Sequence, residues 1–181
     1  MRPAPADDIG RAIEVLNTWD TQDPDPEQIR DLDVFRRFLR WLGRPEAAEQ
    51  VKARDLARFR ATRSRLRNAI DAGSEEAAVD ALNAVLDESP SRARLVREGG
   101  GWRFRFDGPD DRDPLGFLAP LCAVALLSAI RDLGWERLGT CAGSPCTCVF
   151  VDRTRNRRRR FCSDRCNDRV AQAARRRRAA S

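Results

Sequence analysis

The sequence predicts a mainly α-helical chain with one β-hairpin, an α+β fold, followed by a small module at the C-terminus. Three observations support this prediction. Apolar residues recur at helical spacing through most of residues 8–133, a stretch near residues 93–106 alternates like paired strands, and residues 139–181 hold few large apolar side chains. Hydrophobic burial alone cannot order so short a segment, so it needs a metal or a disulfide. We therefore expect two domains, residues 1–138 and residues 139–181.

Helical periodicity predicts the first elements of the chain. The spacing of apolar residues indicates helices over residues 8–19, 27–42 and 45–72. Gly43 and Pro45 mark the end of the second helix, and Gly73 ends the third. Ser74 can cap a fourth helix, because its hydroxyl can accept a hydrogen bond from an amide of the first turn.

Residues 94–106 are expected to form a β-hairpin that turns at residues 98–101. Trp102, Phe104 and Phe106 would project from one face and the arginines between them from the other. Alternating arginines and aromatic residues also suit nucleic-acid binding. We instead interpret the hairpin as a small sheet that covers the helical core and keeps its polar side in water.

An uncharged stretch between Leu115 and Ile130 predicts a buried helix over residues 114–133. The stretch contains Gly116 and Pro120 and is short for a bilayer span. The N-terminus has no apolar segment like that of a signal peptide. We therefore expect a cytoplasmic protein that does not contact a membrane.

Charge divides the chain in two. Residues 139–181 contain twelve arginines and three aspartates, a formal charge of +9, whereas the whole chain carries +6 and residues 1–138 therefore carry −3. A near-neutral body with a cationic module indicates an anionic polymer as partner. A disordered, solubilising tail would explain the arginines, but it would not explain the paired cysteines among them.

The chain contains no histidine, which narrows its chemistry. Catalytic triads or dyads that use histidine, and metal sites with histidine ligands, are excluded. The sequence also shows no pair of carboxylates and no nucleophile beside a base that stands out from its 28 acidic residues. We therefore expect a binding protein and not an enzyme.

Four cysteines, Cys141, Cys146, Cys162 and Cys166, follow the pattern C-x4-C-x15-C-x3-C within the most basic part of the chain. Two short cysteine turns joined by such a loop can close four thiolates around one Zn²⁺ per chain. In a reducing compartment, paired cysteines more often bind metal than form disulfides. Cys148 remains an alternative ligand to Cys146, and Cys122 is expected in the core. We refer to residues 139–181 as the cysteine module.

The residues around these cysteines resemble the bacterial CGNR zinc-finger family. The family signature has a cysteine pair, a hydrophobic-Asp-x-Ser/Thr-Arg-Asn segment, two arginines, an aromatic-Cys-Ser step and a closing Cys-Gly-Asn-Arg. The corresponding segments here are Cys141 with Cys146, residues 150–156, residues 159–163 and residues 166–169. The closing motif departs from the family, because Asn167 and Asp168 replace its glycine and asparagine. We expect a small, treble-clef-like zinc finger.

Residues 10–138 resemble more loosely the ABATE-type stress-induced transcription regulator domain that precedes this finger. Leu16-Asn17-Thr18 looks like the leading motif of that domain, and the order of helices and hairpin fits it. The resemblance implies a DNA-binding transcriptional regulator, associated with the nucleoid when bound to DNA. The N-terminal domain would then dimerise, sense a signal or contact the transcription machinery, and a homodimer through it is left open.

Arginine suits such a role because its planar guanidinium pairs bidentately with phosphate or guanine. A helix over residues 167–180 would carry the last arginines. The candidate nucleic-acid contacts are Arg153, Arg155, Asn156, Arg158, Arg159, Arg160, Arg169, Arg175, Arg176 and Arg177.

Two alternative functions remain. Arginine-rich helices also bind RNA, which allows an RNA- or ribosome-associated zinc protein. Oxidation of Cys148 with a zinc ligand would make a thiol redox sensor.

Overall fold

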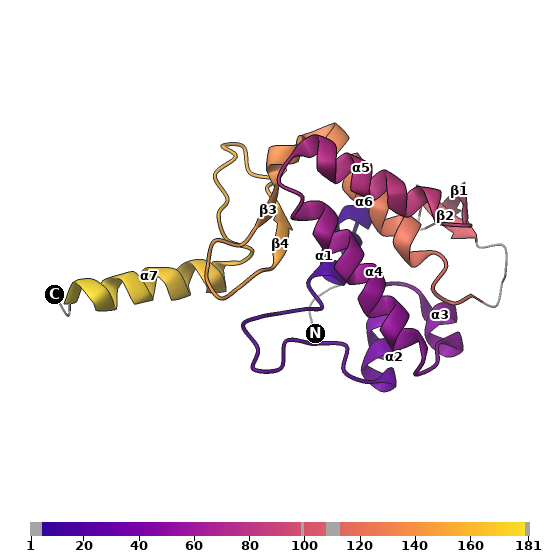
Figure 1. Cartoon of the computed structure of the whole chain (residues 1–181), viewed down its shortest axis with the longest axis horizontal. Helices are drawn as coiled ribbons and strands as arrows, with labels where there is room; N and C mark the ends of the chain where they lie inside the picture. The colour runs from indigo at the N-terminus through magenta and orange to yellow at the C-terminus, as the bar shows by residue number, and fades with distance from the viewer. Residues whose placement is uncertain (1–4, 99, 108–112, 180–181) are drawn as a thin grey trace.

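The structure is a computed structural model that describes residues 5–98, 100–107 and 113–179. It places a helical body, residues 8–133, beside the cysteine module, from which the last helix projects (Figure 1). The elements of the body are α1 (Asp8–Leu16), α2 (Leu32–Trp41), α3 (Pro45–Gln50), α4 (Asp55–Ile70), α5 (Glu75–Asp87), β1 (Arg92–Glu98), β2 (Gly101–Asp107) and α6 (Leu118–Leu133). They are followed by the 3-10 turn η1 (Trp135–Arg137), β3 (Leu138–Thr140), β4 (Val149–Val151) and α7 (Asp164–Ala179).

Helix α6 lies at the centre of the body. It packs against α1, α4 and α5, and its uncharged sequence is buried on most of its surface, as at Leu118 and Leu126. Leu138, Val149 and Val151 from β3 and β4 join the same apolar core. The predicted boundary between residues 138 and 139 therefore lies within β3, and the division into two domains stays a prediction.

Side-chain caps explain where three of the helices begin. Asp7 accepts a hydrogen bond from Gly10 N at 2.7 Å, and Asp31 accepts one from Val34 N at 2.8 Å. The predicted cap of α5 is confirmed, since Ser74 Oγ accepts from Ala77 N at 3.2 Å. Each cap satisfies an amide that has no partner inside its own helix.

The prediction of one helix over residues 45–72 is wrong. The chain leaves the helix at Val51, which is extended (ψ 145°) and fully buried, and α4 starts at Asp55. The carboxylate of Asp55 accepts a hydrogen bond from Lys52 N at 2.8 Å, which stabilises the turn between the two helices. Burial of Val51 therefore outweighs the helical periodicity of this stretch.

In the described part of the chain, no helix is both long and apolar enough to span a membrane.

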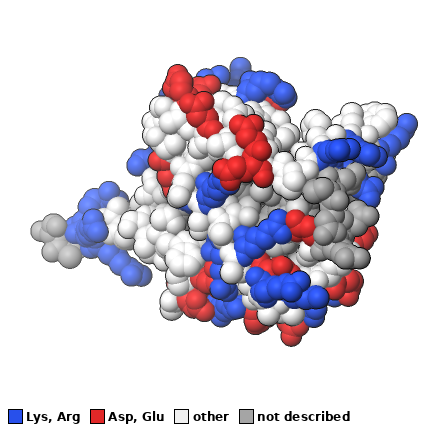
Figure 2. All heavy atoms as spheres, turned by 45° about the vertical axis from the view of Figure 1, so that its right-hand side comes forward, with Lys and Arg blue, Asp and Glu red and all other residues white. Residues whose placement is uncertain are grey.

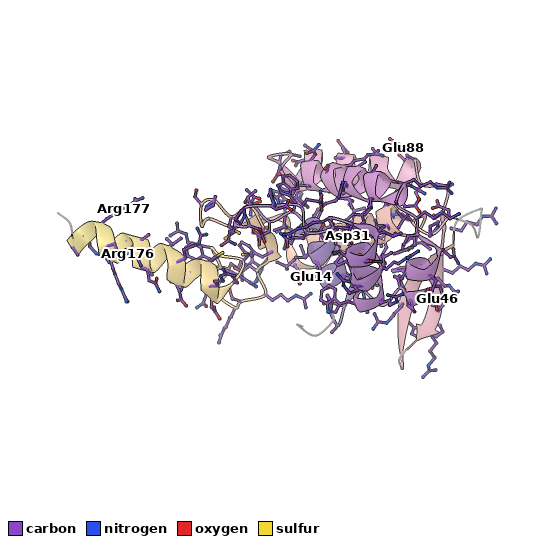
Figure 3. All side chains as sticks on the ribbon, turned by 90° about the horizontal axis from the view of Figure 1, so that it is seen from below. Glu14, Asp31, Glu46, Glu88, Arg176 and Arg177 are labelled. Atoms are coloured by element: carbon purple, nitrogen blue, oxygen red, sulfur yellow. The ribbon has the colours of Figure 1, made fainter. Side chains whose placement is uncertain are left out.

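The hairpin forms as predicted but does not cover the core. Strands β1 and β2 are antiparallel, with Leu95 opposite Phe104. Phe106 is buried, whereas Trp102 is 66% exposed, Leu95 55% and Phe104 43%. The hairpin projects past the helices (Figure 3), and β2 contacts α6, where Phe104 and Phe106 line a small pocket with Leu121 and Ala125. Most of its apolar face lies in solvent.

The loop between α1 and α2 is held by a buried ion pair. Arg63 of α4 is 4% exposed and donates to both carboxylate oxygens of Glu27, at 2.8 and 2.7 Å. It also donates to Thr18 Oγ1 at 3.1 Å and lies over the ring of Trp19. Burial opposes ionisation of Glu27, but the hydrogen bonds from Arg63 and the Ile29 amide outweigh it and lower its pKa.

We expect Arg63→Met to destabilise the protein by about 3 kcal/mol, because the largely buried carboxylate of Glu27 then keeps only the contact with Arg60 at 3.2 Å and the bond from the Ile29 amide. Arg65→Ala is the control, since Arg65 forms an exposed pair with Glu88 and should cost about 0–1 kcal/mol. Urea unfolding at neutral pH measures both. The pKa of Glu27 is lowered on folding, so its contribution is complete above the unfolded pKa and is lost as pH falls through the folded pKa. Equal effects of the two substitutions would contradict a structural role for Arg63.

Candidate metal centre

Four cysteine sulfurs converge between the first cysteine turn and the start of α7. The Sγ atoms of Cys141, Cys146, Cys162 and Cys166 all lie within 4.8 Å of one another. The Sγ atoms of Cys146 and Cys162 are 3.7 Å apart, and those of Cys162 and Cys166 are 3.6 Å apart. Thiolates about 2.3 Å from a tetrahedral zinc ion would be separated by about 3.8 Å. The donor set and its spacing therefore fit one zinc ion.

The first cysteine turn is shaped by hydrogen bonds to its backbone. Cys141 N donates to Cys148 O at 2.9 Å, and Cys146 N donates to Gly143 O at 2.9 Å. The guanidinium of Arg169 reaches across from α7 and donates to Ser144 O at 2.6 Å and to Gly143 O at 2.5 Å. The arginine that ends the closing motif thus joins α7 to the first cysteine pair.

The second cysteine pair is placed by the start of α7. Ser163 Oγ accepts from Cys166 N at 3.4 Å, as an N-cap residue does, and Cys162 N points to Cys141 Sγ at 3.4 Å. Asn167 lies inside α7, and a helical backbone does not require the glycine that the family has at this position. The departure from the family motif at this position therefore leaves the turn intact.

The surroundings of the sulfurs act in both directions: burial raises the pKa of Cys146 and of Cys162, whereas N–H groups approach three of the four sulfurs. Backbone or guanidinium N–H groups approach Cys141, Cys146 and Cys166 at 3.4, 3.5 and 3.9 Å. Burial opposes ionisation of Cys166, but hydrogen bonds from Cys162, Arg169 and Ser163 outweigh it and lower its pKa to about 7. Zinc binds the deprotonated form of cysteine, so the lowered pKa of Cys166 suits the metal, and the other thiols would lose their protons when zinc binds.

Cys148 and Cys122 lie apart from the four-sulfur cluster. Cys148 forms a separate group with Cys146 and Asp20, and burial raises the pKa of its thiol to about 12. The structure therefore brings Cys146 into the cluster and leaves Cys148 beside it. Cys122 is 1% exposed in α6, and burial raises its pKa to about 12 as well. It packs as a small apolar residue of the core.

The buried carboxylate of Asp152 organises the arginine-rich loop after β4, residues 152–161, which we call the arginine loop. It accepts from Thr154 N at 2.8 Å, from Thr154 Oγ1 at 2.6 Å and from Arg159 N at 2.9 Å. The bond from the Thr154 hydroxyl leads the interactions that lower the pKa of Asp152. Arg157 adopts a positive φ of 50°, which closes the loop. The acidic residue of the family motif therefore shapes the loop and leaves its arginines outside.

The predicted nucleic-acid contacts separate into two groups. The guanidinium groups of Arg159 and Arg169 bond to carbonyls of the module itself, and Arg159 also lies over the ring of Phe150. Arg153 pairs with Asp7 of the body. The remaining predicted residues are exposed on the loop or on α7, namely Arg155, Asn156, Arg158, Arg160, Arg175, Arg176 and Arg177.

A groove of about 770 Å³ separates the arginine loop from the start of α7. Arg155, Asn156, Arg158 and Arg160 line one side, and Ser163 and Asn167 are among the residues that line the other. Arg176 and Arg177 project on opposite sides of α7 farther along (Figure 3). Basic side chains cover the projecting part of this helix (Figure 2).

The leading Leu16-Asn17-Thr18 motif contacts the cysteine module directly. Asn17 Nδ2 donates to Val149 O and Val149 N donates to Asn17 Oδ1, both at 2.8 Å, so one side chain extends the edge of β4. Farther along the same loop, Thr21 bonds to Pro145 O and Gln22 lies 3.6 Å from Cys166 Sγ. Residue spacing gave no signal for this contact, because its partners are more than 120 residues apart.

These observations describe a helical body joined to a C-terminal four-cysteine cluster of the kind found in zinc fingers. Residues 11–133 match the model of the ABATE family, described as "Putative stress-induced transcription regulator", and residues 137–179 match the CGNR zinc finger. The chain therefore belongs to the ABATE family and carries a CGNR zinc finger. The family match and the cysteine cluster together support one zinc ion per chain. The comparison with curated proteins finds no match.

We predict that wild-type protein purified without added metal contains about one zinc per chain and that Cys162→Ser and Cys146→Ser lose it. Cys148→Ser is the matched control and should retain zinc, because its sulfur lies outside the cluster. Acidification should release the metal as protons compete for the thiolates. Metal content by mass spectrometry measures these outcomes. Zinc lost from Cys148→Ser and kept in Cys146→Ser would make Cys148 the ligand.

Asn17→Ala should weaken the attachment of the cysteine module, because it removes both hydrogen bonds to Val149. We expect a loss of about 1–3 kcal/mol in the free energy of unfolding and faster hydrogen exchange at the Val149 amide. Asn83→Ala, at an exposed position of α5, is the control. Unchanged exchange at Val149 in the Asn17 variant would show that the contact contributes little.

Proposed function

We propose that this protein is a DNA-binding transcriptional regulator whose zinc finger supplies the DNA contact. The proposal is a binding function and includes no catalytic step. The groove between the arginine loop and α7 carries it, because exposed guanidinium groups line a concave surface on a scaffold held by the cysteine cluster. The family description supports the regulatory part of the proposal.

The exposed arginines provide a surface that suits phosphate. Arg155 and Arg158 have no hydrogen-bond or ion-pair partner among the described residues, so their guanidinium groups are available. Arg160 lies over the ring of Phe161, which orients it at the groove. Phosphate contacts by such side chains give affinity and register, whereas base contacts give sequence preference. We assign Arg155 and Arg158 to phosphate and Asn156 to a base edge or the sugar–phosphate backbone.

Helix α7 extends the cationic surface away from the body. Its last turns carry Arg175 to Arg178, and the helix projects where a duplex can approach it (Figure 1). Arg159 and Arg169 have a different role in this proposal. They hold the loop and the first cysteine turn in place, so their loss would disorder the surface.

We expect the zinc-loaded protein to bind duplex DNA with an affinity that falls steeply with salt. About six phosphate contacts would give a log–log slope of about −5. Replacing Arg155 and Arg158 together by alanine should reduce the magnitude of that slope by about 2. Fluorescence anisotropy with a labelled duplex measures both quantities.

The matched control is the double variant Arg40→Ala with Arg65→Ala, which removes the same charge from exposed ion pairs of the body. It should bind DNA like the wild type. Equal loss of affinity in the two double variants would reduce the interaction to net charge and contradict the groove. Competition by structured RNA that exceeds competition by duplex DNA would make the protein an RNA-binding one.

A further inference from the structure

The hairpin exposes an apolar face that the other residues described in the structure leave largely uncovered. Leu95, Trp102 and Phe104 are three of the four large hydrophobic residues that are exposed in the described part of the chain. Leu95 and Phe104 are directly opposite in the register, so their side chains lie on the same face. Exposed apolar patches on a folded domain commonly mark an interface.

The two edges of the hairpin differ. Strand β2 packs against α6 through its end at Phe106. Strand β1 pairs only with β2 among the described strands, so its outer edge offers unpaired backbone groups. An open edge of this kind is a template for pairing with another strand.

The sequence of β1 is complementary to itself in an antiparallel pair. Centring two copies on Leu95 places leucine against leucine and Arg94 against Val96. The same register places Ala93 against Arg97, so no like charges are directly opposite at these positions. Strand β2 lacks this property, because pairing about Phe104 would set Arg103 against Arg105.

We propose that the chain self-associates through β1, which pairs antiparallel with β1 of a second copy about Leu95 and forms a four-stranded sheet. Phe104 and Leu95 of each copy then form one apolar row across that sheet, which covers both Leu95 side chains. The contact is isologous and therefore closes as a dimer. The surface buried by two short hairpins is small for a stable interface, so the dimer is weak, with a Kd in the micromolar range.

The position of the hairpin in the fold determines how the two copies are oriented in the proposed dimer. The hairpin lies at the end of the molecule away from α7 (Figure 1). Pairing through β1 therefore leaves both cysteine modules pointing outward. The proposal does not depend on DNA binding, because self-association is measured without nucleic acid.

Sedimentation velocity of the zinc-loaded, full-length protein over a range of concentrations tests the proposal. The expected result is a weight-average mass that rises from one chain towards two. Leu95→Arg should remain a monomer, since it sets two arginines against each other at the two-fold axis. Ala57→Arg adds the same charge at an exposed position of α4 and should dimerise like the wild type. A monomeric wild type at every concentration, or a Leu95→Arg variant that dimerises normally, would overturn the proposal.

A change of charge at Ala93 tests the register, because Ala93 lies against Arg97 of the second copy in the proposed pairing. Ala93→Arg should weaken the dimer, since it sets two arginines against each other across the interface. Ala93→Glu should strengthen it. Circular dichroism confirms that each variant is folded, and equal dimerisation of the two folded variants would overturn the antiparallel register.

Discussion

The convergence of four cysteine sulfurs is the constraint on which the C-terminal part of the chain depends. Few large apolar residues are present there, and most of the loop between the cysteine pairs is polar. Burial can therefore contribute little order, and metal–thiolate bonds replace a hydrophobic core. The first cysteine turn and the start of α7 take their positions from this cluster, and Asp152 holds the arginine loop beside them. Loss of the metal would therefore also change the arrangement of the basic surface.

The helical body contributes to the cysteine module through one loop. Arg63 holds that loop by its buried pair with Glu27, and Asn17 uses both amide atoms to bond to β4. Thr21 and Gln22 then contact the cysteine turns themselves. The two matched family regions are therefore in direct contact, and the apolar core continues through β3 and β4. A change in the body that shifted this loop would therefore alter its contacts with the cysteine cluster.

The arginines of the module have two physical roles that charge alone does not separate. Arg159 and Arg169 satisfy backbone carbonyls that the irregular turns leave without partners. Five potential donors in a planar group make arginine suited to this task. Arg155, Arg158, Arg175 and Arg176 are instead exposed, where solvent or a polyanion can satisfy their guanidinium groups. One residue type thus builds the surface and also covers it.

Local features were readable from the sequence alone. Helical periodicity, the Ser74 cap, the hairpin and the cysteine spacing are all set by residues close together in the chain, so their patterns predicted the elements and the zinc cluster. Tertiary structure decided the rest. Four features depend on neighbours that the fold brings together: the break at Val51, the exposure of Trp102, the position of Cys148 beside the cluster and the hydrogen bond from Arg159 to Val151 O. Burial and hydrogen bonding of these residues arise from contacts between distant segments, and the spacing of residues along the chain does not predict such contacts.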